Sequence, residues 1–282
     1  MSQKSPPCRA LILLFCAAAP LLGGCGGSDK DKPTGPTPPV EVLYNNGLDA
    51  VNAKRYTAAN DQFNTLEQNY PFSSWAVNAQ IMQAYSQYLQ NKYFDAISTL
   101  DRFIQLHPAH RDIAYIYYLR ALCYYEQIAD IERDQKGTDQ AMAALHEVVT
   151  RFPNTPFAND ARLKIDLCRD HLAGKEMEIG RYYQKQNLYQ AAVGRFQRVV
   201  DDYQTTAHVP EALERIVEIY LALGLRDQAK KTAAVLGYND PGSEWYQDAY
   251  NKLAAAGEVA EGLPAPSNGS RGFFGRAWHA LF

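Results

Sequence analysis

Apolar residues recur along this chain with the spacing of packed helices. Five alanines are each followed, four and seven residues later, by apolar residues that are mostly large: Ala59, Ala96, Ala141, Ala192 and Ala229. In a helix these positions share one face, where a second helix can approach closely at the alanine and pack between the larger side chains. A proline twelve residues after four of the five alanines ends the helix. The pattern therefore predicts a repeat of helix pairs.

The first helix of each pair is expected directly upstream of the alanine. In the fourth unit Gly180 and Tyr183 precede Ala192 and Phe196 at the spacing of a tetratricopeptide repeat, and the first unit repeats this order from Gly47. Five copies in one register are hard to explain by unrelated amphipathic helices. The sequence predicts an all-α tetratricopeptide-repeat solenoid of five helix pairs plus a capping helix over residues 41–256.

The repeat is irregular, and its irregularity predicts two further features. Successive alanines lie 37, 45, 51 and 37 residues apart, where a simple repeat takes about 34 residues. The surplus of the third unit falls on the charged stretch Asp130 to Asp139 and indicates a loop between two helices. The surplus of the fourth falls in the proline-free stretch 157–186, which predicts one long helix that connects two subdomains.

The N-terminal residues have the pattern of a lipoprotein leader. Lys4 and Arg9 precede an apolar run over residues 10–22, which ends in Leu-Gly-Gly before Cys25. The run is shorter than the ~20 residues that span a bilayer, so residues 1–24 are expected to be a signal peptide. The Leu-Gly-Gly-Cys order resembles a lipobox, which implies diacylglycerol and an acyl chain such as palmitate on Cys25; the alternative is a secretory signal with an incidental cysteine.

The residues after Cys25 bear on localisation. Residues 25–40 are rich in glycine, proline and charge and predict a flexible linker. Gly26 occupies the position where a retention aspartate follows the cysteine in inner-membrane lipoproteins of enteric bacteria. By that resemblance, the chain is expected at the periplasmic face of the outer membrane, held by its lipid.

Composition and motifs argue against catalysis and against nucleic-acid binding. The formal net charge is −3, and no basic cluster marks a nucleic-acid surface. The six histidines are scattered, and the sequence has no His-Glu-x-x-His, Cys-x-x-Cys or glycine-rich phosphate motif. We therefore expect no enzymatic activity, no metal and no cofactor other than the lipid. Cys123 and Cys168 occupy equivalent repeat positions and are expected to be buried thiols, although a disulfide stays open.

Aromatic residues crowd the second and third units. Those that do not fit one buried stripe are expected to form a groove for an extended peptide: Tyr70, Phe72, Trp75, Tyr115, Tyr117, Tyr118 and Tyr124. Packing between repeats is the alternative. The sequence alone leaves open which tyrosines face outward.

Several segments resemble the BamD family of outer-membrane protein assembly factors. The matching segments are Tyr70-Pro71-Phe72, Tyr93 to Ile97, Tyr118 to Leu122, Arg151 to Ala161 and Ile179 to Tyr183. The resemblance covers about residues 42–256, including the inserted loop and the long helix. The repeats and the leader alone would also fit a lipid-anchored repeat scaffold of a cell-wall, Tol-Pal or division complex.

The resemblance implies a function and its partners. It implies that the N-terminal repeats recognise unfolded outer-membrane proteins and that the C-terminal repeats dock a POTRA domain of BamA, in a machine with other BAM lipoproteins. Arg195 matches a family arginine at the BamA contact; the alternative is an arginine that is merely solvated.

The C-terminal residues depart from the enterobacterial form of the family. Residues 257–270 predict a flexible linker, and residues 271–282 form an amphipathic segment. As a helix, the segment would place Phe273, Phe274, Trp278 and Phe282 on one stripe. We expect it to bind lipid or a partner, and a further hypothesis places it on this chain's own groove.

Overall fold

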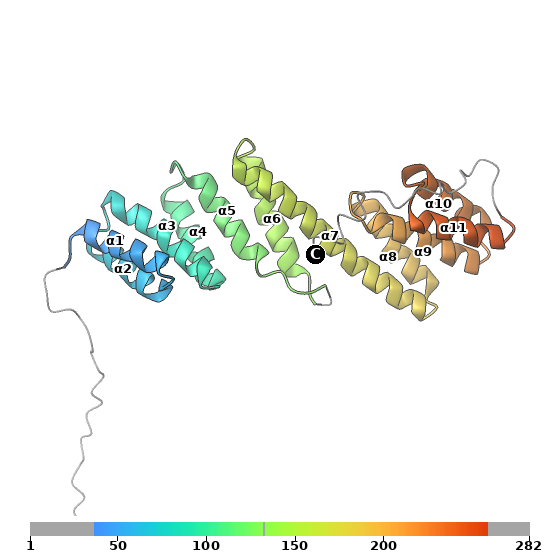
Figure 1. Ribbon diagram of the computed structural model, residues 1–282, viewed down its shortest axis with the longest axis horizontal. Coiled ribbons are helices and arrows are strands. Elements are labelled where there is room, and N and C mark those ends of the chain that lie inside the picture. Colours follow the sequence, from blue (N-terminus) through green and yellow to red (C-terminus); the bar gives the residue numbers. More distant parts are fainter. Residues whose placement is uncertain (1–36, 132, 259–282) are drawn as a thin grey trace, which may run out of the picture. The chain divides into compact units, whose positions relative to one another are not determined.

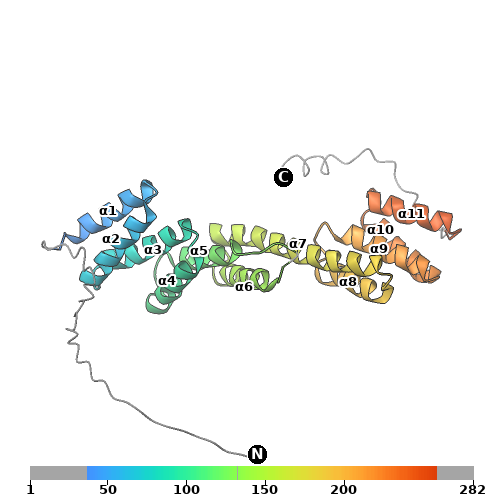
Figure 2. The same ribbon diagram turned by 90° about the horizontal axis from the view of Figure 1, so that it is seen from below.

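The computed structural model describes residues 37–131 and 133–258, and all of its regular elements there are helices. In chain order they are α1 (Val40–Asn52), α2 (Tyr56–Asn69), α3 (Ser74–Leu89), α4 (Tyr93–Leu106), α5 (Ile113–Tyr125), α6 (Lys136–Arg151), α7 (Pro156–Lys185), α8 (Tyr189–Asp202), α9 (Val209–Ala222), α10 (Arg226–Asn239) and α11 (Glu244–Ala255). Consecutive helices pack against one another in pairs, and α11 follows the fifth pair (Figures 1 and 2). The predicted fold, five helix pairs and a capping helix, is confirmed.

In the first and fourth pairs a glycine on one helix faces a phenylalanine ring on the other. The five repeat alanines are fully buried. A Cβ atom added at Gly47 would lie 2.4 Å from the Phe63 ring, and one added at Gly180 would lie 2.5 Å from the Phe196 ring. Only glycine lets the rings sit so close to the backbone of the facing helix.

Four of the five first helices end in the same backbone motif. Lys54, Asn91, Asn187 and Gly224 all have a positive φ. The next residue then donates its N–H back across the helix end, as Arg55 does to the carbonyl of Ala50 at 2.8 Å. This is the Schellman motif, which satisfies the free carbonyls at a helix end and turns the chain into the second helix.

The third pair departs from that motif because a longer loop separates its helices. The loop follows Tyr125, and α6 begins at Lys136. The sequence pattern placed the surplus residues as far as Asp139, so the expected end of the loop was wrong by four residues. Gln135 stabilises the end of the loop, because its side-chain amide donates to the carbonyls of Arg133 at 2.9 Å and Ile131 at 3.3 Å.

The long helix predicted for the fourth unit is α7, which runs unbroken for 30 residues. In its first part Ala161, Ile165 and Cys168 are buried against α5 and α6. In its second part Ala173 and Met177 are buried against α8 and α9. The buried stripe thus moves between Leu172 and Ala173 by about 100° around the axis. One helix contributes to two separate cores.

The first part of α7 repeats the register of another first helix. Ala161, Ile165 and Cys168 are followed, 51 residues later, by Ala212, Ile216 and Ile219 on α9, and both sets face the preceding second helix. α8 packs against the second part of α7. The two parts of α7 therefore each take the place of a first helix, one packed on α6 and the other on α8.

The predicted signal peptide 1–24, Cys25 and most of the linker 25–40 lie outside the described residues, as do the linker from residue 259 onward and the segment 271–282. Residues 1–37 and 38–282 form separate units. No helix within the described ranges is long and apolar enough to cross a membrane.

Candidate functional site: the face of the first helices

The first helices of successive pairs touch one another through their side chains. The Tyr115 ring on α5 lies 5.6 Å from that of Phe157 on α7, and the Tyr118 ring stacks on Phe157 at 5.3 Å. The Tyr118 hydroxyl also donates to a carboxylate oxygen of Asp160 on α7. We call the surface formed by these contacting side chains of α3, α5, α7, α9 and α11 the first-helix face.

In the N-terminal half, the tyrosines of this face are held as neutral hydroxyls. Burial, and then the nearby Tyr85, raise the pKa of Tyr115 to about 12. Burial, and then Glu126, raise the pKa of Tyr88 to about 12, and the Tyr88 hydroxyl donates to Glu126 at 3.2 Å. Such side chains offer an aromatic surface with hydrogen-bonding tips.

The aromatic surface continues onto α7 as exposed apolar side chains. Leu163 and Leu167 are 65% and 48% exposed and are four residues apart, so they share one side of the helix. Beside them the Lys164 ammonium lies 4.7 Å above the centre of the Tyr125 ring and 3.7 Å from Asp160. The aromatic stretch thus gains an aliphatic edge.

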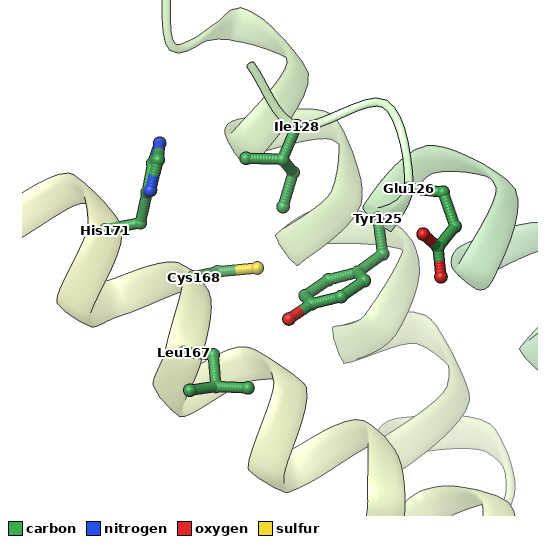
Figure 3. Close-up of a pocket in the computed structure, with 6 residues that line it drawn as sticks. All are labelled: Tyr125, Glu126, Ile128, Leu167, Cys168 and His171. Carbon is green, nitrogen blue, oxygen red and sulfur yellow. The ribbon is translucent and has the colours of Figure 1, made fainter. Parts of the chain in front are cut away.

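A pocket of about 270 Å³ lies between the end of α5 and the middle of α7. Its lining residues are Tyr125, Glu126, Ile128, Leu167, Cys168 and His171. Figure 3 shows the Cys168 sulfur and the Tyr125 ring directed into the same space from the two helices. A pocket that combines the Leu167 and Ile128 side chains with polar groups suits an aromatic side chain that has a polar partner beside it.

The C-terminal half of the first-helix face has a different chemistry. Tyr117 and Ala121 on α5 and Leu213 and Val217 on α9 are core residues 96 positions apart. The same offset places Glu211 and Glu214 where α5 carries Tyr115 and Tyr118. Aromatic positions in one half are therefore acidic in the other.

Ion pairs and hydrogen bonds connect the charged half of the face. Arg181 on α7 binds Glu211 on α9 at 3.1 Å. Gln184 on α7 donates to Glu218 on α9 at 2.8 Å. Lys252 on α11 binds Glu214, which is only 2% exposed. Burial raises the pKa of Glu214, while the Lys252 ammonium opposes that rise. These contacts join α7, α9 and α11.

Arg195, the predicted partner-docking residue, lies on α8 and is engaged within the chain. Its guanidinium binds Glu176 of α7 at 3.0 Å, and Arg198 binds the other oxygen of the same carboxylate at 3.1 Å. Glu176 is 8% exposed, whereas the Arg195 side chain is 34% exposed. Arg195 is therefore ion-paired within the chain while part of its side chain stays accessible, and its place at a BamA contact stays a prediction.

Three of the predicted groove residues lie elsewhere, at the corner between α2 and α3. The Tyr70 hydroxyl donates to the carbonyl of Pro38 at 3.1 Å, and the Trp75 ring packs 5.0 Å from that of Tyr44. The Phe72 side chain is fully exposed. Tyr70 and Trp75 thus fasten the start of α1, and these three residues do not join the α5 tyrosines.

Among the predicted α5 residues, the structure separates outward from inward positions. Tyr115 and Tyr118 belong to the first-helix face. Tyr117 is 7% exposed and lies in the core with Ala121, so its expected place in the groove was wrong. Arg120 and Arg151 cover its ring at 5.0 and 5.1 Å. Tyr124 is half-buried between the second and third cores.

Leu163 and Leu167 were not foreseen as surface residues of the face. The repeat spacing contained the signal, because an offset of 51 residues aligns them with Glu214 and Glu218 on α9. The aligned positions belong to the first-helix face in both helices. The long helix had to be recognised as carrying two registers before this alignment could be made.

The two cysteines of the helical body are buried and free, as expected. Burial raises the pKa of the Cys123 thiol to about 12 and that of the Cys168 thiol to about 11, which disfavours the reactive thiolate. Within residues 37–131 and 133–258, His, Cys, Asp and Glu side chains form no group of three or more that could hold a metal ion.

Comparisons with known proteins agree on one family. The family model YfiO, described as outer membrane lipoprotein, matches residues 36–236. The outer membrane protein assembly factor BamD of Caulobacter vibrioides is 48% identical over 246 residues, which cover 86% of this chain and 80% of the relative. BamD of Rickettsia prowazekii is 48% identical over 230 residues, which cover 82% and 91%.

More distant similarity follows the same line. BamD of Neisseria meningitidis serogroup B is 34% identical over 245 residues, which cover 82% of this chain and 92% of the relative. Among solved structures, the TPR2AB domain of yeast Sti1 matches with a TM-score of 0.41 and 12% identity over 77% of this chain and 84% of that chain. A structural match of that size is too weak to support a conclusion.

Proposed function

The chain belongs to the BamD (YfiO) family of outer membrane protein assembly factors, and from this premise we propose that it is a non-enzymatic scaffold of the β-barrel assembly machine. Its C-terminal repeats hold a POTRA domain of BamA, and its N-terminal repeats receive unfolded outer-membrane proteins. The observation that carries this division of labour is the change of the first-helix face from tyrosine and leucine to ion pairs.

The N-terminal half suits an unfolded substrate. Tyr115, Tyr118 and Phe157 give rigid aromatic contact area, and Leu163 and Leu167 add accessible apolar surface. A chain that is still unfolded exposes its aromatic side chains and its backbone groups, so it can use both the rings and the hydroxyls of such a surface.

The C-terminal half suits a folded partner. Its face is occupied by intramolecular ion pairs, which leaves α8 to offer the accessible part of Arg195 beside Arg198. An arginine already oriented by Glu176 loses less side-chain freedom when it binds an acidic group on a partner. A preformed contact of this kind favours a stable rather than a transient attachment.

We further propose that Cys25 carries the lipid and that residues 25–40 tether the helical body to the outer membrane. Other lipoproteins of the machine would share that membrane surface. Replacing Cys25 with serine should abolish acylation and remove the chain from the outer-membrane fraction, with the uncleaved precursor as the visible product. A Cys25→Ser chain that still carried the acyl mass would contradict the assignment.

The partner assignment is tested by a pull-down of the lipidated chain from detergent-solubilised outer membranes. Arg195→Gln should lose BamA, whereas Arg198→Gln, which removes the other cation from Glu176, serves as the matched control and should retain it. Circular dichroism must show equal helix content for both. Loss of BamA with both variants would indicate that the Glu176 cluster only shapes α8.

A further inference from the structure

The pocket beside Leu167 lies next to two leucines that are exposed to solvent. Leu163 and Leu167 are 65% and 48% exposed, and the pocket of about 270 Å³ opens next to Leu167. The equivalent positions on α9, Glu214 and Glu218, are both engaged by Lys252 of α11. On α9, helix α11 therefore covers the equivalent surface, whereas the α7 leucines are exposed to solvent.

The charge around this pocket is mixed, and Glu126 is the one acidic residue among those that line it. Asp160 and Asp170 lie along the same helix as the leucines. Lys164 is paired with Asp160, and His208 lies 3.7 Å from Asp170. An occupant with aromatic side chains and an arginine would match the Leu167 and Ile128 side chains and the Glu126 carboxylate.

The chain itself contains a segment of that chemistry. Residues 271–282 read Arg-Gly-Phe-Phe-Gly-Arg-Ala-Trp-His-Ala-Leu-Phe, with four aromatic residues, two arginines and no acidic side chain. The segment follows the last described residue, Glu258, after 12 intervening residues, 259–270. These residues can span up to about 40 Å.

The linker and the segment together are long enough to reach the pocket. Neighbouring packed helices lie about 10 Å apart, so the steps from α11 to α9 and from α9 to Arg181 on α7 amount to roughly 20 Å, and Leu167 lies 14 residues, about 21 Å, further along α7. The 19 residues 259–277 that precede Trp278 can span roughly 60 Å. The pocket is thus within reach of the segment on its own chain.

We propose that residues 271–282 dock intramolecularly at the pocket between α5 and α7, with an aromatic side chain beside Leu167 and Cys168 and an arginine facing Glu126. The occupied pocket is closed to other extended aromatic segments. The C-terminal segment is therefore a built-in competitor that an incoming chain must displace.

The test uses a fluorescein-labelled synthetic peptide of residues 271–282 and measures its anisotropy with two forms of the protein. A chain that ends at Ser270 should bind the peptide. The full chain should bind it at least tenfold more weakly, because a segment tethered by a short linker competes at an effective concentration in the millimolar range. Equal affinity for both forms would overturn the proposal.

Substitutions in the shortened chain locate the binding. Leu167→Asp should weaken the peptide at least tenfold, while Leu188→Asp, at a leucine of similar exposure, 53%, should leave affinity unchanged. Equal loss in both, or in neither, would contradict docking at this pocket. Leu167→Ala provides a milder variant if the aspartate lowers helix content.

A photo-crosslinking residue at position 278 of the full chain gives an independent readout. Intramolecular crosslinks to peptides of α5 and α7 are expected, both in detergent and in vesicles of phosphatidylethanolamine and phosphatidylglycerol. Crosslinks to lipid, or to other helices alone, would overturn the proposal in favour of a membrane or another surface. Neither experiment requires an outer-membrane protein substrate, so its failure is distinct from failure of the proposed function.

Discussion

Tyr115 and Tyr118 on α5 occupy the positions that Glu211 and Glu214 occupy on α9, within one repeated backbone frame. On α5 the pair makes an aromatic surface that extends to Phe157 and continues to exposed leucines. On α9 the pair is bound by Arg181 and Lys252 from the neighbouring helices. The repeat thus fixes the packing of the helix pairs, while its outward positions let one half stay open to a ligand and lock the other half.

The largest change in stability should come from removing an ion pair of the charged half. Lys252→Met leaves Glu214, 2% exposed, without its main counter-charge, and we expect a loss of about 2 kcal/mol in the free energy of unfolding. The 37% exposure of Lys252 keeps the loss below that of a fully buried pair. Urea unfolding at pH 7 measures it, and Arg226→Met, at a more exposed ion pair, is the control and should change little.

The same variant should show a defined pH dependence. Burial raises the pKa of Glu214 above its ordinary 4.5, so the folded chain holds more protons than the unfolded chain just above that pH, and stability falls as pH rises through the window. Removal of Lys252 raises the folded pKa further. The deficit of Lys252→Met should therefore shrink as the pH falls towards 4.5. A constant deficit would show that Lys252 acts by packing alone.

The shared frame predicts equal effects in the two halves. Gly47→Ala and Gly180→Ala each force a Cβ atom to within 2.4 and 2.5 Å of a phenylalanine ring. Each should cost about 2 kcal/mol of stability through overpacking. Gly194→Ala, whose Cβ meets nothing within 4 Å, should instead stabilise α8 by up to about 1 kcal/mol. Thermal unfolding of the three variants measures these changes; very different costs at Gly47 and Gly180 would break the equivalence of the halves.

Substitutions in the two halves should differ in their effect on the affinity for an unfolded substrate. If the aromatic half receives unfolded outer-membrane proteins, Tyr118→Ala and Leu167→Ala should each weaken binding of a urea-unfolded barrel protein about tenfold, or about 1.4 kcal/mol. Glu218→Ala in the charged half should change affinity less than twofold. Fluorescence anisotropy in dilute urea measures this. A greater loss with Glu218→Ala would assign substrate to the other half.

The smallest expected effect concerns the turns within pairs. Lys54 has a positive φ of 58°, which costs a residue with a side chain about 1 kcal/mol, whereas Gly224 adopts the corresponding position at 73° without that cost. Lys54→Gly should therefore stabilise the chain by up to about 1 kcal/mol, and Gly224→Lys should destabilise it similarly. Differential scanning calorimetry resolves both. A destabilising Lys54→Gly would mean that the lysine side chain makes a compensating contact.

The sequence was sufficient for the repeat because its signals are local. The alanine and the apolar residues four and seven positions later lie on one turn-to-turn face, so spacing alone predicted the buried stripes around Ala96 and Ala192. Which tyrosines face outward depends on how each helix is rotated against two neighbours. Tyr117 and Tyr118 are adjacent in sequence and similar in chemistry, yet one is core and the other binds Asp160.

The candidate site was harder to predict because it depends on contacts between units. Arg195 was found by family resemblance, but its bond to Glu176 follows from the close pairing of α7 and α8, which no local pattern states. In the sequence, nothing distinguishes Leu163 and Leu167 from other members of an amphipathic helix until the double register of α7 is known.

The double register of α7 also bears on how the molecule unfolds. In an array whose units meet only their neighbours, individual segments can melt separately. Here the melting of the core around Cys168 would strip the support from half of a helix whose other half carries Met177 in the next core. The boundary where such an array would otherwise divide is bridged by continuous backbone hydrogen bonds. The two halves of the chain should therefore unfold in one cooperative transition, and α7 is the element that couples them.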